Sequence, residues 1–246
     1  MSWVEGQVIQ NKHWTEQHHS LRVEASIQPF QAGQFTRLAL DIDGERIARP
    51  YSFINAPHEP FLEFYFNRVP DGIISNRLSA LKEGDTLWVS SQGAGFLTLA
   101  EVPQAEHLWL FAAGTAIGPF LSILKTEEPW QRFSKIILVH GVRSVEELTY
   151  QDEIQQFVQR DPKKFTALPS VTRQNCDSAM KDRIPLAIQS GELEKRVGLA
   201  LNPTYSQAMI CGSPVMVQNT REALKLRGLK KHLRHKPGHV ISEDYK

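Results

Sequence analysis

Cysteine is scarce in this sequence, and its placement excludes several kinds of site. The chain of 246 residues has two cysteines, Cys176 and Cys211. They form neither a Cys-x-x-Cys pair nor the spacing of a zinc or iron–sulfur site. So few cysteines are typical of a reducing compartment. We therefore expect a cytoplasmic protein without a metal.

Long apolar runs and net charge are lacking as well. No run approaches the roughly 20 residues of a membrane-spanning helix, and the charged, alternating N-terminus is unlike a signal peptide. The 28 basic and 27 acidic side chains leave a formal charge of +1, which argues against a nucleic-acid partner. With 41% hydrophobic residues, the composition is typical of a globular protein with a real core. We expect no membrane partner.

Up to about residue 100, apolar and polar residues alternate with a period of two. Such alternation, interrupted by Gly, Pro, Asn and Asp, predicts short antiparallel strands. With one short helix predicted over residues 75–84, this half is expected to form a small antiparallel barrel or sandwich. The predicted strands are residues 6–14, 21–27, 34–42, 61–69 and 85–92.

The second half has near-continuous apolar runs instead, which are typical of parallel strands covered on both faces. Helix-like segments at 146–160 and 214–228 follow two of them, so we predict a doubly wound α/β domain. The expected domains are residues 1–101 and 102–246. The apolar runs are residues 107–114, 135–142, 164–171 and 208–213.

The stretch "FAAGTAIGPF" joins one of these strands to a helix. The Gly-x-Gly-x-x-Gly motif is absent, because Gly114 and Gly118 are its only glycines. Gly114 still permits close approach of a ligand to the backbone, and Pro119 suits the first turn of a helix. A phosphate-binding turn and a turn without a ligand are both compatible with this pattern.

Three arginines follow the predicted parallel strands. Arg143 and Arg173 come directly after two strands, and Arg183 follows a short loop later. Ligands of open parallel sheets bind at the carboxyl ends of strands, so these guanidinium groups could meet one dianion. We favour the 2′-phosphate of NADP over solvated surface arginines. Glu146 and Glu147 would suit the ribose of NAD, but acids also favour a helix N-terminus.

Three further patterns have alternative interpretations. In "RPYS", Tyr51 could stack on an aromatic ligand, or the stretch could be an edge strand, because Pro50 cannot donate a hydrogen bond. The basic stretch 224–239 could steer an acidic electron carrier, or be a solvated helix end. His232, His235 and His239 lie in it, but the flanking cations disfavour a metal site. His18 and His19 are expected in a loop or edge strand.

Six stretches together are specific. They are "RPYS" at 49–52, "FYFNRV" at 64–69, "PDGIISNRL" at 70–78, "AAGTAIGP" at 112–119, "ICGSPVMV" at 210–217 and the ending "SEDYK". This set closely resembles the ferredoxin/flavodoxin–NADP reductase family, in its compact bacterial branch. The similarity covers essentially the whole chain in order and spacing. It implies that FAD lies on the barrel and NADP on the α/β domain.

The resemblance also implies roles on the flavin side. Arg49 would contact the FAD pyrophosphate, Tyr51 would stack on the isoalloxazine ring, and Ser52 would place its hydroxyl beside flavin N5. The other implied FAD contacts are Phe64, Tyr65 and Phe66 along the flavin edge, Gly72, Ile74 and Ser75 around the phosphates, Thr115 beside both cofactors, and Tyr245.

For NADP, the resemblance implies that the glycine turn faces the pyrophosphate. The implied contacts are Gly114, Thr115 and Gly118 in that turn, Arg143, Arg173 and Arg183 at the 2′-phosphate, and Cys211 and Gly212 near the nicotinamide. Catalytic roles are implied for Tyr51, Ser52, Cys211, Glu243 and Tyr245, with Glu243 linked to proton movement and Tyr245 covering the flavin.

Simpler interpretations of the C-terminal residues also exist. Cys211 would suit a buried position at a strand end, and Glu243 a solvated chain end. Lys246 stands where relatives often carry a second aromatic residue that stacks on the FAD adenine, so the chain departs from them there.

The implied function is transfer of hydride from NADPH to FAD, followed by release of single electrons to ferredoxin or flavodoxin. The reaction is reversible in principle, and a monomer is expected. One alternative is an NADPH-dependent reductase of free flavin, ferric chelates or an oxygenase component. Another is a non-catalytic NADPH-binding module.

Overall fold

The computed structural model describes residues 2–245 and separates into two compact units. The N-terminal unit consists of Met1–Thr98 together with Gly118–Thr126, and the C-terminal unit of Leu99–Ile117 together with Glu127–Lys246. Helix α2 (Gly118–Leu124) thus groups with the N-terminal unit although it follows a strand of the other. Among residues 2–245, no helix has both the length and the apolar character needed to cross a membrane.

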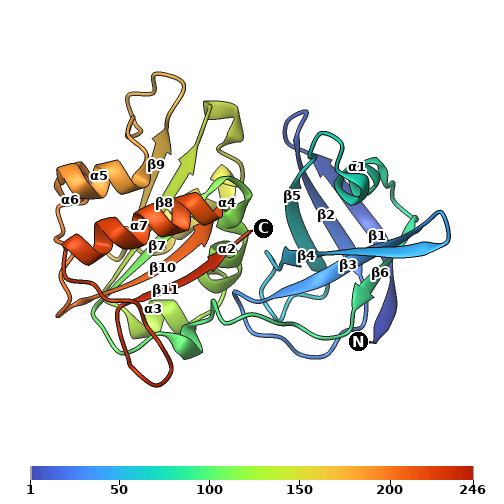
Figure 1. The fold of residues 1–246 in the computed structure, drawn as a ribbon, viewed down its shortest axis with the longest axis horizontal. Coiled ribbons are helices and arrows are strands. Elements are labelled where there is room, and N and C mark those ends of the chain that lie inside the picture. The colour runs from blue at the N-terminus through green and yellow to red at the C-terminus, as the bar shows by residue number, and fades with distance from the viewer. Residues whose placement is uncertain (1, 246) are drawn as a thin grey trace. The chain divides into compact units, whose positions relative to one another are not determined.

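A curled antiparallel sheet forms the N-terminal unit (Figure 1). Its strand order is β4-β3-β6-β1-β2-β5. Period-two alternation directs one side of each strand into a common core, in which Leu21, Leu38, Phe64 and Val89 are fully buried. The strands are β1 (Trp3–His13), β2 (His18–Glu24), β3 (Phe35–Ile42), β4 (Glu45–Ser52), β5 (Leu62–Asn67) and β6 (Thr86–Ser90).

The two edge strands of this sheet are brought together just after β4. Phe53 and Phe64 form an isolated antiparallel bridge, and Ile54 N donates to Glu63 O at 2.9 Å. The two phenylalanine rings are buried with centroids 5.6 Å apart. Apolar burial at this bridge therefore curls the sheet toward closure, and the expected antiparallel barrel fold is confirmed.

The stretch "RPYS" forms the end of β4, in agreement with the interpretation of it as an edge strand. Among residues 2–245, β4 pairs with β3 on one side and is an edge strand, and Pro50 lies opposite Arg37. A proline is tolerated there because an edge strand has one side without ladder hydrogen bonds.

The prediction for His18 and His19 was wrong. Both lie in β2, which pairs with β1 on one side and β5 on the other, and they are 5% and 3% exposed. His19 stacks on Phe66 with ring centroids 5.8 Å apart, and His13 meets it edge-on at 4.4 Å. Imidazoles are amphipathic enough to pack against β5 aromatics in this way.

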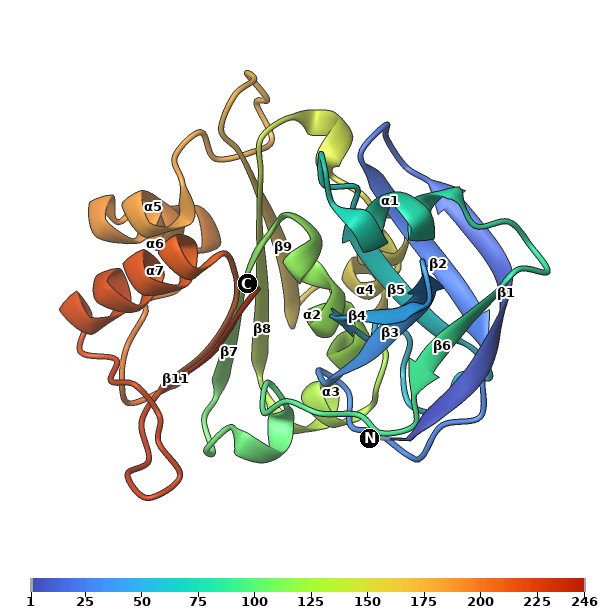
Figure 2. The same ribbon diagram turned by 45° about the vertical axis from the view of Figure 1, so that its right-hand side comes forward.

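The C-terminal unit is a parallel five-stranded sheet with strand order β11-β10-β7-β8-β9 (Figure 2). Helices α5, α6 and α7 cover one face and α3 and α4 the other (Figures 1 and 2). The doubly wound α/β fold is thus confirmed. The strands are β7 (His107–Ala113), β8 (Lys135–Val142), β9 (Phe165–Val171), β10 (Ser206–Gly212) and β11 (Val240–Asp244).

Near-continuous apolar strands form the core of this unit. Trp109, Phe111, Ile137, Val139 and Ile210 pack beneath α5 and α7. The α-helices of this unit are α3 (Glu128–Arg132), α4 (Gln151–Arg160), α5 (Ile184–Ser190), α6 (Glu192–Val197) and α7 (Pro214–Leu226), and its short 3₁₀ turns are η1 (Leu99–Glu101), η2 (Gly114–Ile117) and η3 (Val145–Glu147). The N-terminal unit adds helix α1 (Ile73–Ala80).

Two segments of the C-terminal unit differ from the sequence prediction. The helix predicted over 146–160 begins only at Gln151, because Tyr150 adopts a left-handed conformation with φ of 57°. Residues 240–244 form a fifth strand, β11, which pairs in parallel with β10. The alternation in β11 is too short to predict a strand by itself.

His19 in β2 predicts a dependence of stability on pH. Burial, with the neighbouring charges of His13, Arg68 and His18, lowers the pKa of His19. Its folded pKa lies below the unfolded value, so the unfolded chain binds more protons as the pH falls through about 6.5, and stability is lost there. The temperature at the midpoint of thermal unfolding should therefore decrease as the pH is lowered from about 8 to about 5.5.

The variant His19→Phe keeps a ring against Phe66 and should flatten this acid loss. The same change at His58, which is exposed, is the matched control and should leave the loss intact. Equal pH profiles for wild type and His19→Phe would contradict the prediction.

Candidate functional site

The parallel sheet reverses its strand order between β7 and β10. From β7 the chain builds β8 and β9 on one side, then returns to place β10 and β11 on the other. At such a switch point the crossovers lie on opposite faces of the sheet, and ligands of open α/β sheets bind there, at the carboxyl ends of the strands. Gly114 follows β7 and Gly212 ends β10, and Ala112 pairs with Cys211. The two glycine-containing motifs therefore meet at this point.

The backbone at Gly114 has the geometry of a ligand cradle. Its φ is +57°, and a Cβ added there would meet no protein atom within 4 Å. Only glycine adopts this conformation without strain, and the open space leaves room for a phosphate group. Gly212 is crowded instead, because a Cβ there would lie 2.8 Å from Met216 Sδ and 3.4 Å from Ala113. These residues fit a bound dinucleotide.

Helix α7 begins at the same end of the sheet, where β10 ends. Pro214 is its first residue, and Ser213 Oγ accepts a hydrogen bond from Met216 N at 3.3 Å. This side-chain cap and the N-terminal proline define the start of the helix. The first turn contains no acidic residue, so nothing there opposes an anionic ligand.

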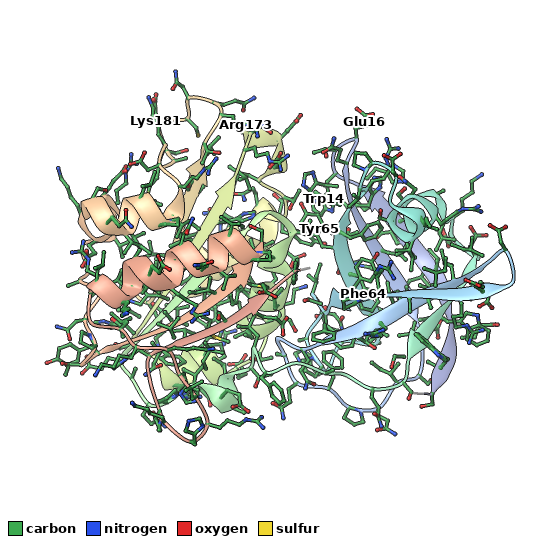
Figure 3. All side chains as sticks on the ribbon, viewed as in Figure 1. Trp14, Glu16, Phe64, Tyr65, Arg173 and Lys181 are labelled. Atoms are coloured by element: carbon green, nitrogen blue, oxygen red, sulfur yellow. The ribbon has the colours of Figure 1, made fainter. Side chains whose placement is uncertain are left out.

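The three predicted arginines lie at the carboxyl ends of β8 and β9. Arg173 N donates to Arg143 O at 2.8 Å, which joins the two strand ends, and Arg183 caps α5. All three are exposed, and within residues 2–245 none of them forms an ion pair with an acidic side chain. Arg173 and Lys181 extend from the loops at the upper end of the sheet (Figure 3). These free cations suit a phosphate dianion.

Pairing of β10 with β11 brings three predicted catalytic residues together. Cys211 and Glu243 are register partners, and Tyr245 N donates to Gly212 O at 2.9 Å. Burial raises the pKa of the Cys211 thiol and the Glu243 charge raises it further, while a hydrogen bond with the Tyr245 side chain lowers it. Cys211 is fully buried, so it is a neutral thiol at physiological pH.

Glu243 is a strand residue rather than a solvated chain end. Burial, with a smaller effect of the Asp244 charge, raises the pKa of Glu243 to about 7. A carboxyl group with this pKa exchanges a proton near neutral pH. The interpretation of Glu243 as a solvated tail residue is therefore wrong in structural terms. Lys246 lies outside the described residues.

In the N-terminal unit, Tyr51 packs edge-on against Phe66 with ring centroids 5.7 Å apart. Burial raises the pKa of Tyr51 to about 12, against the opposing charge of Arg49, so its phenol stays neutral. Ser52 is 6% exposed beside it, whereas the Arg49 guanidinium is exposed. A half-buried aromatic face with a cation two residues away fits a flavin and its phosphates.

The β5 residues that the resemblance assigns to FAD are more buried than those of β4. Phe64, Tyr65 and Phe66 are 0%, 5% and 3% exposed. Phe64 lies within the core of the sheet, and Tyr65 lies on β5 near the turn that joins β1 to β2 (Figure 3). Any contact of Phe64 with a ligand must therefore come from its backbone.

A tight loop precedes α1. Gly72 N donates to Val69 O at 2.9 Å, Val69 N donates to Ser75 Oγ at 3.1 Å, and a Cβ on Gly72 would lie 2.6 Å from Ser75 Oγ. The loop therefore requires glycine at this position. Ile74 is buried beneath it, and the first turn of α1 contains no acid. The helix N-terminus is thus compatible with an anion.

Two predicted residues of the glycine turn fall in different units. Thr115 belongs to η2 of the C-terminal unit, and Gly118 to α2 of the N-terminal unit. Gly118 is tightly packed, because a Cβ there would lie 3.2 Å from Ile54. Its role in the fold is therefore close packing of α2 on the barrel.

Acids from elsewhere in the chain neutralise part of the basic stretch 224–239. Arg227 pairs with Glu194 at 2.8 Å and Arg234 with Glu101 at 2.6 Å. The exposed lysines of the stretch are Lys225, Lys230, Lys231 and Lys236. The first three line a surface groove of about 690 Å³ between α7 and β11, together with Arg221, Glu222 and Asp244.

Two of the three histidines of this stretch, His232 and His239, bind backbone groups. His232 Nδ1 accepts from Gly238 N, and His239 Nδ1 accepts from Lys230 N at 3.1 Å. Among residues 2–245, no group of three His, Cys, Asp or Glu side chains is placed to hold a metal ion.

The two units correspond to two known families of domain. Residues 12–94 match the oxidoreductase FAD-binding domain, and residues 110–222 match the oxidoreductase NAD-binding domain. This pair defines the class of flavin- and nicotinamide-dependent oxidoreductases. Within the class, the chain belongs to the flavodoxin/ferredoxin–NADP reductase family, as its full-length similarity to members of that family shows.

The relatives match over nearly their whole length. The chain is 47% identical over 244 residues to flavodoxin/ferredoxin–NADP reductase of Escherichia coli, covering 99% of this chain and 98% of that protein. It is 37% identical to ferredoxin–NADP reductase of Pseudomonas aeruginosa, covering 91% and 89%. A ferredoxin NADP⁺ reductase structure from Neisseria gonorrhoeae with bound FAD and NADP has a TM-score of 0.94 at 30% identity, covering 99% of both chains.

The raised pKa of Glu243 predicts how its removal changes stability. The folded pKa lies above the unfolded value, so the folded chain binds more protons between about pH 4.5 and 7, and stability falls as the pH rises through that range. Glu243→Gln removes the buried charge and should raise stability near pH 8.5 by on the order of 1–2 kcal/mol, with less effect near pH 5.

Thermal unfolding of the variant and the wild type at the two pH values measures this difference. Glu222→Gln on the exposed side of α7 is the control and should show no such pH dependence. A gain for Glu243→Gln that is equal at both pH values would contradict the assignment of burial as its cause.

Proposed function

We propose that this chain is an FAD-containing enzyme that oxidises NADPH and passes electrons singly to ferredoxin or flavodoxin, reversibly in principle. The observation that carries the proposal is the match to flavodoxin/ferredoxin–NADP reductases over 99% of the chain. The domains are proposed as residues 1–101 for FAD and 102–246 for NADP. When bound, FAD supplies the step between two-electron hydride transfer and one-electron release.

On the flavin side, the residues of β4 hold and orient the ring. Tyr51 supplies the stacking face and Ser52 a hydroxyl at the reactive edge, while Arg49 neutralises the pyrophosphate. In the loop of Gly72, Ile74 and Ser75, the backbone N–H groups of Ile74 and Ser75 at the start of α1 face the phosphates, and Gly72 provides the tight turn that presents them. The β5 residues Phe64, Tyr65 and Phe66 line the flavin edge, with Phe64 contributing backbone.

On the nucleotide side, the switch point of the parallel sheet receives NADP. Gly114 and Thr115 present backbone N–H groups to the pyrophosphate. Gly212, which has no side chain, lets the nicotinamide approach the backbone closely. Arg143, Arg173 and Arg183 bind the 2′-phosphate. Their exposure and lack of acidic partners among residues 2–245 support this role.

The residues of β10 and β11 handle the proton and exclude water. Glu243 holds or releases a proton at its carboxyl oxygen near neutral pH, which its pKa of about 7 supports. Cys211 contributes a neutral, buried thiol beside the nicotinamide. Tyr245 would supply an aromatic ring to cover the flavin when FAD is bound.

We infer that an acidic electron carrier docks on the exposed lysines of the basic stretch. Lys225, Lys230, Lys231 and Lys236 remain for this role after Arg227 and Arg234 are paired internally. Complementary charge speeds such association. A monomer in the cytoplasm is proposed as well, and the free thiols of Cys176 and Cys211 are compatible with a reducing compartment.

The purified protein should contain FAD, and NADPH should bleach it under anaerobic conditions. Mixing the reduced protein with ferredoxin or flavodoxin from the same cell should restore the oxidised spectrum faster than free flavin or a ferric chelate does. Stopped-flow absorbance measures both steps.

Acid should release FAD, because the chain shows no attachment motif. A colourless protein or FMN alone would overturn the cofactor assignment, and faster reoxidation by free flavin or a ferric chelate would favour that class of reductase.

The arginine cluster predicts a preference for NADPH over NADH. Each charge-assisted contact to the dianion is worth about 1.5–3 kcal/mol, or at least about tenfold in affinity. Arg143→Ala or Arg173→Ala should lower kcat/KM for NADPH by about tenfold or more relative to that for NADH. Arg196→Ala, which breaks an exposed pair on α6, is the control. Equal losses with both nucleotides would assign these arginines a structural role.

A further inference from the structure

His140 is a buried imidazole on β8 to which no role has been assigned. Its side chain is 3% exposed. Ile137 and Val139 pack under α5 and α7, and side chains alternate along a strand, so His140 faces the opposite side of the sheet. Burying an imidazole costs free energy unless its polar atoms are hydrogen-bonded. A specific partner is therefore expected.

That partner is the glycine turn of the neighbouring strand. His140 Nε2 lies 3.0 Å from Gly114 O. A carbonyl oxygen only accepts hydrogen bonds, so Nε2 carries the proton and donates it. The register of β7 and β8 pairs Ala112 with His140, two residues before Gly114, which begins the turn that follows β7.

The hydrogen bond to Gly114 O also fixes the direction of the next N–H group, that of Thr115, because one peptide bond joins the two. In a planar trans peptide, C=O and the following N–H lie in one plane and point in opposite directions. With Gly114 O held on the imidazole, the N–H of Thr115 must point away from it. Gly114 has φ of +57° and no Cβ, so without a partner its peptide planes would rotate easily.

We propose that His140 is a positioning residue for the nucleotide. By donating to Gly114 O it holds the 114–115 peptide so that the Thr115 N–H faces the pyrophosphate of NADP. The inference rests on the proposed function, because it assigns the turn to that pyrophosphate. His140 itself touches no substrate. Its removal should therefore weaken ligands that carry the pyrophosphate and spare ligands bound through the 2′-phosphate alone.

Calorimetric titration of the FAD-loaded protein with NADP⁺ and with adenosine 2′-monophosphate tests this separation. His140→Leu should weaken NADP⁺ by about three- to tenfold, the value of one hydrogen bond, and change the affinity for adenosine 2′-monophosphate by less than about twofold. His140→Gln carries a side-chain N–H donor and should recover part of the loss. His140→Met is a second donor-free variant should the leucine variant fail to fold.

His107→Leu is the matched control, because His107 lies at the start of β7, at the other end of the strand from the turn. Equal weakening of both ligands, the same effect from His107→Leu, or unchanged affinity for NADP⁺ would each overturn the role of His140. Failure of the wild-type protein to bind NADP⁺ would overturn the proposed function together with this inference.

Discussion

Parallel pairing of β7 with both β8 and β10 is the constraint on which the nucleotide side of this protein depends. The strand order reverses at β7, with β8 and β9 on one side and β10 and β11 on the other, and open α/β sheets bind ligands at the carboxyl end of such a switch point. The pairing aligns Ala112 with both His140 and Cys211. The glycine turn, the buried imidazole and the buried thiol therefore lie together at the carboxyl end of the sheet, although they are far apart in the sequence.

The flavin side depends on a different kind of contact. Two edge strands of a curled sheet approach each other because Phe53 and Phe64 bury their rings together. Their meeting places Tyr51 of β4 against Phe66 of β5. Burial of this aromatic cluster orients the tyrosine, and the hydrogen-bonded loop before α1 adds a second rigid element to the same unit.

Burial also changes the chemistry of the C-terminal segment. As a chain-end residue in water, Glu243 would be ionised at neutral pH. Its place on β11 beside β10 raises the pKa to about 7, so the carboxyl can take up and release a proton. The same burial keeps Cys211 a neutral thiol. A strand of five residues thus accounts for the acid–base properties proposed for this end of the chain.

Much of the fold and the candidate site could be predicted from the sequence. Period-two alternation predicted the antiparallel sheet, and continuous apolar runs predicted the parallel one, because local patterning reflects which faces are buried. Gly114 and the strand-end arginines were found in the same way. The family resemblance, which the comparisons confirm, extended this reading to FAD and NADP.

The remaining features depend on contacts between distant segments. β11 exists because β10 offers it a partner, and β2 is internal because β1 and β5 flank it, so the burial of Glu243 and His19 could not be predicted from their neighbours in the chain. The pairing of Arg227 with Glu194 and of Arg234 with Glu101 likewise needs the folded chain. Residue types, turns and periodicity were determined by the sequence alone, whereas the tertiary structure decided which polar groups lost their water, because burial is a property of the packed chain.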